Sequence, residues 1–314
     1  MKNILLVGGA GYVGGAVSNE LISEGYNLRV YDNLLYENSY MKNIEFIFGD
    51  VRDKKKLKAN LSWADAVIWM AAIVGDGACD INKENTIDIN QNSVKWLSRN
   101  FDGRIIFFST CSVYGAQDGI LDEKCQVNPL SLYARTKLEA EKYLSNKNAL
   151  IFRLGTLFGI SDTYSRLRMD LVVNLLTIKA HFNKELTIFG GEQFRPLLHV
   201  KDVARAVVKA IKINKVGVYN LKYDNYKISE LANLVQKSFK EKIKIKTTKM
   251  MFQDTRNYMV SSNLFDKNFK FKAKYDVTFG INEIIELINS NRIKNFDDIR
   301  YTNYLYLKKY GINT

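Results

Sequence analysis

Two residues capable of acid–base chemistry, Tyr133 and Lys137, stand four positions apart in the segment LYARTKLEAEKYL. On a helix this spacing places both side chains on one face. A phenol, whose pKa is about 10, is a weak base at neutral pH, but an adjacent ammonium stabilises the phenolate and lowers that pKa. The pair could therefore take a proton from a substrate hydroxyl, although a surface tyrosine beside a solvated lysine has the same spacing.

A group of hydroxyl side chains ends the apolar segment that reads FFSTCSVYG over 107–115. Ser109, Thr110 and Ser112 could simply bond to nearby backbone, which is the ordinary role of such residues at the end of a strand. Because Tyr133 and Lys137 open the next expected helix, the same hydroxyls are also candidates to contact a substrate. The residues alone do not decide which hydroxyl does so.

Near the N-terminus, the segment GGAGYVGG places Gly8, Gly11 and Gly14 in a GxxGxxG pattern between an apolar run and an expected helix. A Cβ in such a turn would block the tight backbone path and the close approach of a pyrophosphate. The N–H groups and positive dipole end of the following helix then attract the phosphates. The pattern predicts a dinucleotide-binding site, with Tyr12 and Val13 beside the glycines.

Two aspartates end strands that are expected after this turn. Asp32 ends the second strand, where its carboxylate can accept hydrogen bonds from the adenosine ribose hydroxyls. No basic residue follows it directly to hold a 2′-phosphate, so the sequence favours NAD over NADP. Asp50 ends the third strand and is either a contact to the adenine edge or an ordinary turn residue before a helix. Val51, Ala71 and Ala72 complete the expected cofactor contacts.

The first half of the chain alternates short apolar runs with amphipathic segments. This alternation predicts an α/β fold with a Rossmann-type, doubly wound parallel sheet that is covered by helices on both faces. We expect strands at 2–8, 27–32, 44–50, 66–72, 104–110 and 149–155, and helices at 12–24, 53–61, 84–100 and 131–144.

After about residue 160 the alternation becomes less regular, which predicts a smaller, mixed α/β C-terminal lobe; its role as the substrate lobe is what the family resemblance described below implies. We expect residues 1–165 plus 196–222 to form the NAD-binding domain, and residues 166–195 plus 223–314 to form the substrate lobe. The expected elements are helices at 169–181, 202–213, 228–239 and 280–289, strands at 185–190, 217–222 and 242–247, and an extended segment at 195–200.

The composition is that of a globular protein, with 46% hydrophobic and 25% charged residues in a chain of 314. The net charge of +13 comes from scattered lysines without interleaved aromatic residues, a pattern that favours a solvated basic surface over nucleic-acid binding. No apolar run approaches the roughly 20 residues of a membrane span. Three widely spaced cysteines and two histidines predict a cytoplasmic protein without disulfides or a metal site.

Together these motifs resemble the extended short-chain dehydrogenase/reductases, in the branch of NAD-dependent nucleotide-sugar epimerases and dehydratases. The resemblance extends over nearly the whole chain. It is carried by GGAGYVGG (8–15), YDN (31–33), GDVRD (49–53), MAA (70–72), STCSVYG (109–115), YARTK (133–137), RLGTLFG (153–159), RPLLHVKDVARA (195–206) and DTRNYMVS (254–261). It implies an enzyme that acts on a nucleotide-diphosphate sugar in surface-polysaccharide biosynthesis.

The resemblance also implies roles for particular residues. By position, Thr110 matches the catalytic Ser/Thr of the family, Tyr133 matches its base, and Lys137 matches the residue that binds the nicotinamide ribose and lowers the tyrosine pKa. Asn33 matches a further adenosine contact, and Arg195 matches an arginine that commonly meets the diphosphate of the nucleotide sugar.

Further positions in the resembling motifs receive less direct roles. Some relatives carry an arginine for the diphosphate near residues 250–252, and Arg256 could substitute for it. The stretch 166–174 is expected at the substrate phosphates, with Asn174 as a contact. We expect His199 to be a hydrogen-bonded packing residue and Asp202 to be the N-cap of helix 202–213.

The implied chemistry is oxidation of the sugar at C4, and the outcome after that step depends on neighbouring residues. A 4,6-dehydratase of this family has an Asp-Glu pair directly after the catalytic threonine, where this chain has Cys111 and Ser112. A 3,5-epimerase/reductase would have Cys in place of Ser112. A 4-epimerase or a C4 dehydrogenase remains favoured, with a dehydratase, a 4-ketoreductase or an NAD-sensing scaffold protein as alternatives.

Relatives often dimerise by packing two helices of each subunit into a four-helix bundle. The corresponding helices of this chain span about 84–100 and 131–144. The resemblance therefore implies a homodimer.

Overall fold

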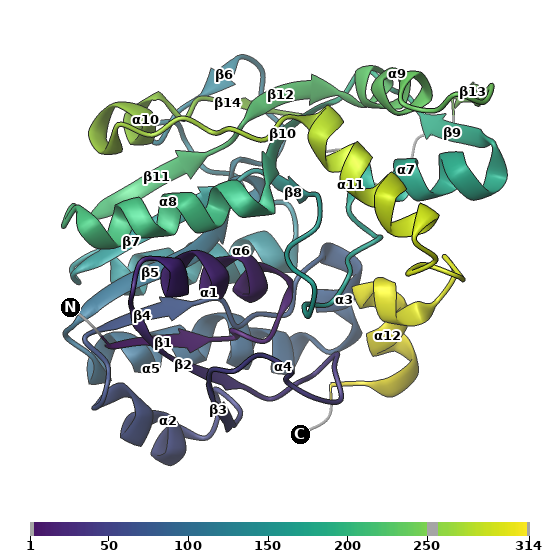
Figure 1. Ribbon diagram of the computed structural model, residues 1–314. Coiled ribbons are helices and arrows are strands. Elements are labelled where there is room, and N and C mark those ends of the chain that lie inside the picture. Colours follow the sequence, from purple (N-terminus) through teal and green to yellow (C-terminus); the bar gives the residue numbers. More distant parts are fainter. Residues whose placement is uncertain (1–2, 250–256, 313–314) are drawn as a thin grey trace.

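The computed structural model describes residues 3–249 and 257–312, and a seven-stranded parallel sheet forms its larger half (Figure 1). The strand order is β11-β7-β5-β4-β1-β2-β3, so the predicted Rossmann-type, doubly wound fold is confirmed. The strands are β1 (Asn3–Val7), β2 (Asn27–Asp32), β3 (Glu45–Phe48), β4 (Ala66–Trp69), β5 (Arg104–Thr110), β7 (Ala149–Leu154) and β11 (Gly217–Leu221).

Helices cover both faces of this sheet (Figure 1). The covering follows from the apolar sequences of the central strands, since every residue of β4, β5 and β7 is buried. One face packs against α1 (Tyr12–Ser23) and α8 (Val200–Lys212), and the other packs against α2 (Lys54–Leu61), α5 (Ser93–Asn100) and α6 (Leu132–Leu144).

The direction of winding reverses at β1. From β1 the chain passes through α1 to β2 on one side, whereas β4 pairs with β1 on the other side. The loops that leave β1 and β4 therefore diverge and leave a crevice at the carboxyl ends of these strands. This crevice is the usual ligand site of open α/β sheets.

The smaller half is the mixed lobe that the second part of the sequence predicts. Its three-stranded sheet contains both parallel and antiparallel pairs. The lobe comprises β8 (Thr156–Phe158), β10 (Phe194–His199) and β12 (Asp224–Lys227), the pair β9 (Glu185–Phe189) and β13 (Lys244–Thr248), and helices α7 (Val172–Asn183), α9 (Ile228–Lys237) and α11 (Val277–Asn289). A separate short parallel pair consists of β6 (Ile120–Leu121) and β14 (Met259–Val260).

The helix expected over 84–100 is present, but a π-helical turn interrupts it. This turn, η1 (Asp88–Asn92), joins α4 (Lys83–Ile87) to α5. Inside it, the buried Asn90 accepts a hydrogen bond from the N–H of Ile73 at 2.8 Å and donates one to the carbonyl of Ile73 at 2.9 Å. The turn thus fixes the loop that leaves β4, in keeping with the frequent use of π-bulges at functional sites.

Several short helices are absent from the sequence prediction, because six to eight residues show no clear apolar period. Their packing is nevertheless tight: Phe265 and Phe269 lie fully buried in the core between the sheet and α8, and Leu307 lies fully buried in the core on the opposite face. These helices are α3 (Asp76–Ile81), α10 (Asn263–Phe269) and α12 (Asn303–Tyr310).

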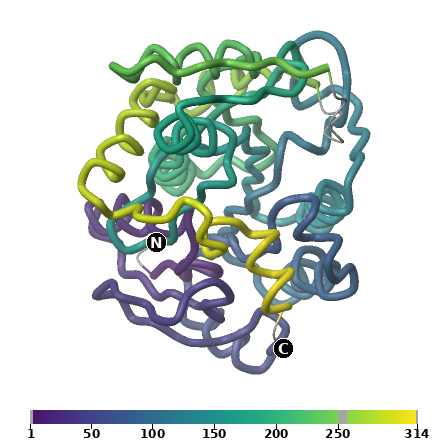
Figure 2. Tube along the Cα trace, turned by 90° about the vertical axis from the view of Figure 1, so that its right-hand side faces the viewer, coloured from purple at the N-terminus to yellow at the C-terminus, as the bar shows by residue number. Residues whose placement is uncertain are grey.

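The C-terminal segment returns from the smaller half to the larger one. Figure 2 shows this segment in yellow, running from α11 back down toward the part of the molecule that contains the N-terminal strands. There α12 packs against α3. Residues 263–271 and 303–312 therefore pack with the large sheet, although the sequence analysis assigns them to the substrate lobe.

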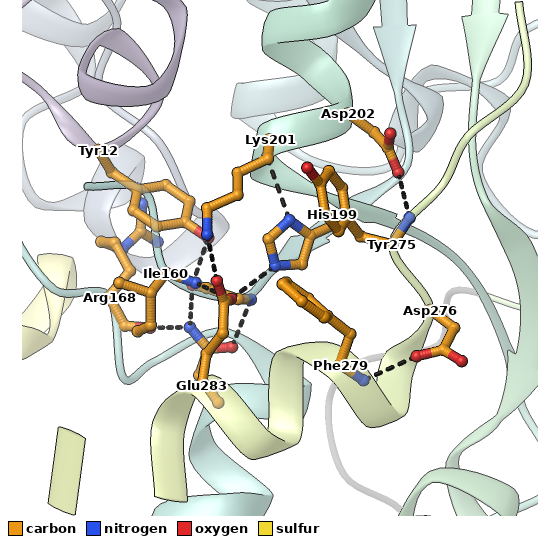
Figure 3. Close-up of polar contacts among 12 residues, drawn as sticks. Tyr12, Ile160, Arg168, His199, Lys201, Asp202, Tyr275, Asp276, Phe279 and Glu283 are labelled. Carbon is orange, nitrogen blue, oxygen red and sulfur yellow. Dashed lines mark hydrogen bonds and ion pairs between the residues drawn. The ribbon is translucent and has the colours of Figure 1, made fainter. Parts of the chain in front are cut away.

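A buried histidine and a glutamate connect the two halves (Figure 3). His199, which is fully buried, accepts a hydrogen bond at Nδ1 from the N–H of Lys201, so its Nε2 carries the proton toward Glu283 of α11 at 2.8 Å. Glu283 also pairs with the Lys201 ammonium and accepts from the N–H of Ile160. The structure thus places His199 as the hydrogen-bonded packing residue that the sequence predicts.

The prediction for Asp202 is wrong in its position. Helix α8 begins at Val200, and the side chain of His199 caps it. Asp202 is the third residue of the helix, in its first turn, and its buried carboxylate accepts hydrogen bonds from the N–H groups of Lys274 and Tyr275. The error arises because this carboxylate binds backbone N–H groups of a segment that lies 72 residues later in the chain. A local sequence pattern does not reveal such a distant partner.

The Glu283 network makes a testable prediction about stability. Burial alone would raise the pKa of Glu283, but the hydrogen bonds from His199 and Lys201 outweigh it and hold the pKa below its ordinary value. We expect Glu283→Gln to lower the free energy of unfolding by about 1–3 kcal/mol at pH 7. Because the folded pKa is depressed, this stabilisation is lost as pH falls below about 4. Urea unfolding at several pH values measures it.

A matched control lies one turn further along the same helix. Glu286 is exposed, so Glu286→Gln should change stability by no more than about 0.5 kcal/mol. A loss for Glu283→Gln that stays constant down to pH 3 would show that the carboxylate charge is not the stabilising feature.

Candidate active site

A cavity of about 780 Å³ lies at the carboxyl ends of the large sheet and extends to the smaller lobe. It begins at the crevice between β1 and β4 and reaches β9 and β10. Most residues that the sequence singles out line it together, although they come from distant parts of the chain. These are Gly8, Gly11, Tyr12, Val13, Asp32, Asn33, Asp50, Val51, Ala71, Ala72, Thr110, Tyr133, Lys137 and Arg195.

The three glycines of the N-terminal turn differ in what they make room for. Gly8 has φ +80, and a Cβ there would lie 2.4 Å from the amide nitrogen of Ala71. A Cβ on Gly14 would lie 2.2 Å from the carbonyl oxygen of Gly9. A Cβ on Gly11, in contrast, would meet only the Gly8 carbonyl, at 3.5 Å. Gly8 and Gly14 therefore serve backbone packing, whereas Gly11 leaves open space in the turn.

That open space lies at the N-terminus of α1. Gly11 is the N-cap residue, and no side chain caps the helix. The first N–H groups of α1 and its positive dipole end are thus available to an anionic group. This turn fits the diphosphate of a dinucleotide, as the sequence predicts.

Asp32 lies in the cavity wall beside the turn. Its carboxylate accepts hydrogen bonds from the N–H groups of Ala10 at 3.0 Å and Leu34 at 2.8 Å. Burial raises the pKa of Asp32, and these backbone hydrogen bonds oppose that rise. The carboxylate is therefore oriented by the glycine turn itself, on the wall of the cavity.

Asn33 and Asp50 contact each other. The amide of Asn33 donates to a carboxylate oxygen of Asp50 at 2.9 Å, and the guanidinium of Arg52 binds both oxygens at 2.8 and 2.9 Å. Burial alone would raise the pKa of Asp50, but the hydrogen bonds from Arg52 and Asn33 lower it. Asp50 is thus an ionised, oriented group on the cavity wall, and its carboxylate also accepts a hydrogen bond from the N–H of Arg52 at 2.8 Å, as a turn residue does.

The sequence-predicted acid–base residues lie at the far end of β5. Thr110 is the last residue of that strand, and its hydroxyl accepts a hydrogen bond from the N–H of Ser112 at 3.1 Å. Tyr133 lies in the first turn of α6, a helix that Ser131 caps by accepting from the N–H of Ala134. Burial raises the pKa of Tyr133, whereas its hydrogen bond with Thr110 lowers it. The two hydroxyls are therefore neighbours.

Lys137 lies one turn after Tyr133, with 2% of its surface exposed. Its ammonium donates to the carbonyl oxygen of Phe108 in β5 at 2.8 Å and lies 4.8 Å from the ring centroid of Phe107. Burial lowers the pKa of Lys137 to about 8. The hydrogen bond also fixes the start of α6 against the end of β5, which carries Thr110.

The other polar residues of the β5 end have structural partners. Ser109 donates to the buried Glu141, which in turn forms an ion pair with Arg153 at 2.7 Å. The fully buried Cys111 thiol donates to the Arg153 carbonyl at 3.2 Å, and burial raises its pKa. Neither Ser109 nor Cys111 is thus arranged to donate or accept a proton in the cavity.

Three predicted site residues lie elsewhere. Gly14 packs inside the turn rather than on the cavity wall. Asn174 is fully buried, and its amide bonds to the backbone of Gly159 and to the carbonyl of Arg168. In this structure Asn174 orients a loop and does not line the cavity. Arg256 lies outside the described residues.

The cavity also contains polar residues that the sequence analysis does not assign individually. Arg166, Arg168 and Asp170 line it from the loop before α7, and Asn303 lines it from the start of α12. The stretch 166–174 is expected at the substrate phosphates, but it gives no indication of which side chains face the cavity. Asn303 shows no sequence signal, because only the return of the C-terminal segment brings it to this wall.

Residues 3–249 and 257–312 contain neither a metal-binding cluster nor a membrane-spanning helix. Within these ranges, no cluster of three or more His, Cys, Asp and Glu side chains could hold a metal ion. No helix in the same ranges combines the length and apolar character needed to cross a membrane.

Comparisons with known proteins agree with this geometry. A sequence model of the NAD dependent epimerase/dehydratase family matches residues 4–221. A putative UDP-glucose 4-epimerase of Methanocaldococcus jannaschii is 32% identical over 230 residues, which are 66% of this chain and 73% of that protein.

Solved structures show the same fold. The UDP-glucose 4-epimerase of Thermotoga maritima with UDP-glucose superposes with a TM-score of 0.82 at 21% identity, covering 92% of this chain and 99% of that one. A UDP-glucose 4-epimerase of Stenotrophomonas maltophila, with bound NAD and a formylated UDP-arabinopyranose, gives a TM-score of 0.83 at 20% identity and covers 94% and 100% of the two chains.

The buried ammonium of Lys137 makes a prediction for the protein without nucleotide. Because the folded pKa of about 8 lies below the ordinary lysine value, the unfolded chain binds more protons between about pH 8 and 10.5, and stability rises with pH there. Lys137→Met removes the buried charge, so we expect it to raise the free energy of unfolding at pH 7 by about 1–3 kcal/mol. Urea titrations measure this gain.

The gain should shrink as pH rises through that window, because the wild-type lysine becomes neutral in the folded state. Lys95→Met on α5, in a half-exposed position, is the control and should show no such pH-dependent gain. A Lys137→Met variant that is less stable than wild type at pH 7 would contradict the account.

Proposed function

The chain belongs to the NAD dependent epimerase/dehydratase family, and from that premise we propose that it oxidises the sugar of a nucleotide sugar at C4. One observation carries the proposal. Thr110, Tyr133 and Lys137 line the same cavity as the residues of the crevice between β1 and β4 and residues of β9 and β10 in the smaller lobe. A ligand that enters from the smaller lobe would therefore meet the acid–base residues next to the cofactor.

In this proposal the chain's own residues move one proton. Tyr133 takes the proton of the C4 hydroxyl, and Thr110, hydrogen-bonded to the same phenol, holds the substrate oxygen. Bound NAD supplies the acceptor for the hydride that leaves C4. Since burial raises the pKa of Tyr133, the positive charge of Lys137 must offset this effect for the phenol to act as a base.

The substrate phosphates would be held by Arg195, which is buried and lines the cavity from β10. Arg256 is proposed as a second contact on sequence grounds alone. Asn174 is no longer included, because its amide already bonds to the backbone of the loop before α7.

Cys111 and Ser112 favour an epimerase or a dehydrogenase over a 4,6-dehydratase. Elimination at C6 requires an acid and a base, and neither residue is a carboxylic acid. Cys111 is also fully buried, and its thiol donates a hydrogen bond to the backbone carbonyl of Arg153. The names of the M. jannaschii and T. maritima relatives add weight to a 4-epimerase. A C4 dehydrogenase that does not return the hydride is the second candidate.

The biological setting is part of the same proposal. We place the enzyme in the cytoplasm, as a homodimer acting in surface-polysaccharide biosynthesis. Support for the dimer comes from the packing of α6 against α5 and η1, since these neighbouring helices form one face against which a second copy of the chain could pack.

We also propose the division into two domains that the sequence predicts. Residues 1–165 plus 196–222 form the NAD-binding domain, with the helices α10 and α12 packed onto it, and the remaining residues form the sugar lobe.

Tyr133→Phe tests the base directly. The variant keeps the ring and its packing but cannot accept the proton, so we expect turnover to fall by about 10²–10⁴-fold while bound NAD is retained. Tyr164→Phe, at a tyrosine with 59% exposure, should leave turnover unchanged. Activity that survives in Tyr133→Phe would remove Tyr133 from the role of base.

The reaction class can be read from products. We expect incubation with UDP-, GDP- and dTDP-sugars to give a C4 epimer or a 4-keto sugar in NMR spectra. A 4-keto-6-deoxy product would show that the chain is a dehydratase in spite of Cys111 and Ser112. Conversion of none of these substrates would favour a scaffold role.

A further inference from the structure

One wall of the cavity is formed by polar side chains that the proposed reaction does not use. We call it the arginine wall, and it consists of Tyr36, Arg166, Arg168, Asp170 and Asn303, all of which line the cavity. They come from three distant segments: the loop after β2, the loop before α7, and the start of α12.

Arg166 is the least exposed cation of this wall, with 7% of its surface accessible. Its Nε donates to the carbonyl of Arg300 at 2.7 Å, its Nη1 donates to the side chain of Asn303, and its guanidinium lies 4.1 Å from the ring centroid of Tyr36. Its Nη2 is buried and has no hydrogen-bond partner among the described residues. A buried charged donor without an acceptor is costly and calls for an explanation.

Tyr36 presents a second donor of the same kind. Its hydroxyl is buried and also lacks a hydrogen-bond partner within residues 3–249 and 257–312. Burial raises the pKa of Tyr36 to about 12, so the hydroxyl keeps its proton at neutral pH. An oxygen-rich anion would satisfy this hydroxyl and the guanidinium of Arg166 together.

Position in the cavity indicates which anion this is. Tyr36 follows Asp32 by four residues, on the loop that leaves β2 beside the expected adenosine site. Arg168 and Tyr12, the first residue of α1, both line the cavity, and Figure 3 draws the two side chains close together. The arginine wall therefore belongs to the part of the cavity that contains the uncapped N-terminus of α1.

We propose that Arg166 and Tyr36 bind the diphosphate of NAD from the side opposite the glycine turn. The diphosphate then has two positive neighbours, the N-terminus of α1 and the guanidinium of Arg166. The sequence predicts that the stretch 166–174 lies at the phosphates of the substrate, whereas this proposal assigns Arg166 to the diphosphate of NAD. The inference rests on NAD binding and does not depend on the proposed sugar chemistry.

Asn303 positions Arg166 in this arrangement. Its side chain accepts from Arg166 and donates to the carbonyl of Val74 at 2.9 Å, and its own N–H donates to Asp170 at 3.0 Å. Asp170 in turn pairs with Arg168 at 2.6 Å. The C-terminal segment, which returns to the large sheet in Figure 2, thus completes the cofactor site.

Arg29 shows why an unpartnered nitrogen alone is not a site. Its guanidinium lies 4.3 Å from the ring centroid of Trp63 and pairs with Glu45 at 2.7 Å, and its buried Nε also lacks a partner among the described residues. Arg29 does not line the cavity, however. It is therefore a matched control: a stacked, partly buried arginine away from any ligand.

The experiment compares Arg166→Met, Tyr36→Phe and Arg29→Met in the full-length protein after dialysis to remove bound nucleotide. Calorimetric titration with NAD, ADP-ribose, adenosine and UDP measures the affinity for each ligand. NAD and ADP-ribose carry the diphosphate of the cofactor, adenosine lacks a diphosphate, and UDP carries the diphosphate of the substrate. We expect Arg166→Met to lower the binding affinity for NAD and ADP-ribose by about 10- to 100-fold. Tyr36→Phe should lower the same affinities by a smaller factor. Adenosine and UDP binding should be unchanged, and Arg29→Met should match wild type for every ligand.

Unchanged binding of NAD and ADP-ribose by Arg166→Met would overturn the proposal. An equal loss for adenosine would also overturn it, because the defect would then be general rather than specific to the diphosphate. A loss confined to UDP would assign the wall to the substrate. If Arg166→Met does not fold, Arg166→Lys with Tyr36→Phe replaces it, and normal NAD affinity in both would equally refute the role. None of these outcomes tests the sugar chemistry.

Discussion

The close approach of Gly8 to Ala71 is the constraint on which the site depends. The carbonyl of Val7 accepts hydrogen bonds from both Met70 and Ala71, so the turn after β1 lies directly against the loop that leaves β4. No Cβ fits between them. This contact fixes the crevice where the winding of the sheet reverses, and it directs the N-terminus of α1 into the cavity. Asp32, the cofactor contacts and the arginine wall are arranged around that point.

A second set of contacts brings the acid–base residues to the same crevice. The hydrogen bond from Lys137 to the carbonyl of Phe108 joins α6 to β5, and this places Tyr133 beside Thr110. Burial of the ammonium lowers the pKa of Lys137 to about 8, which means that the folded chain bears an electrostatic cost without its cofactor. The role proposed for Lys137 thus keeps a buried charge that selection for stability alone would not favour.

The sequence predicts those parts of the protein that depend on local patterns. Glycine spacing places the turn, short apolar runs place the parallel strands, and the four-residue spacing of Tyr133 and Lys137 places both on α6. Prediction fails where a residue's partner lies far away in the chain. Asp202 bonds to the segment after α10, which lies 72 residues later in the chain. Asn303 reaches the cavity only because the C-terminal segment returns to the large sheet, and the hydrophobic pattern of the sequence does not predict this path.

The central claim is that the chain removes hydrogen from C4 of a nucleotide sugar. The most direct measurement is single-turnover conversion of an accepted nucleotide sugar that carries deuterium at C4, compared with sugars labelled at C3 or C5. Our account predicts that only the C4 label slows the reaction, because only the C4–H bond breaks in the first chemical step. Slowing by a label at C3 or C5, with none from C4, would contradict it.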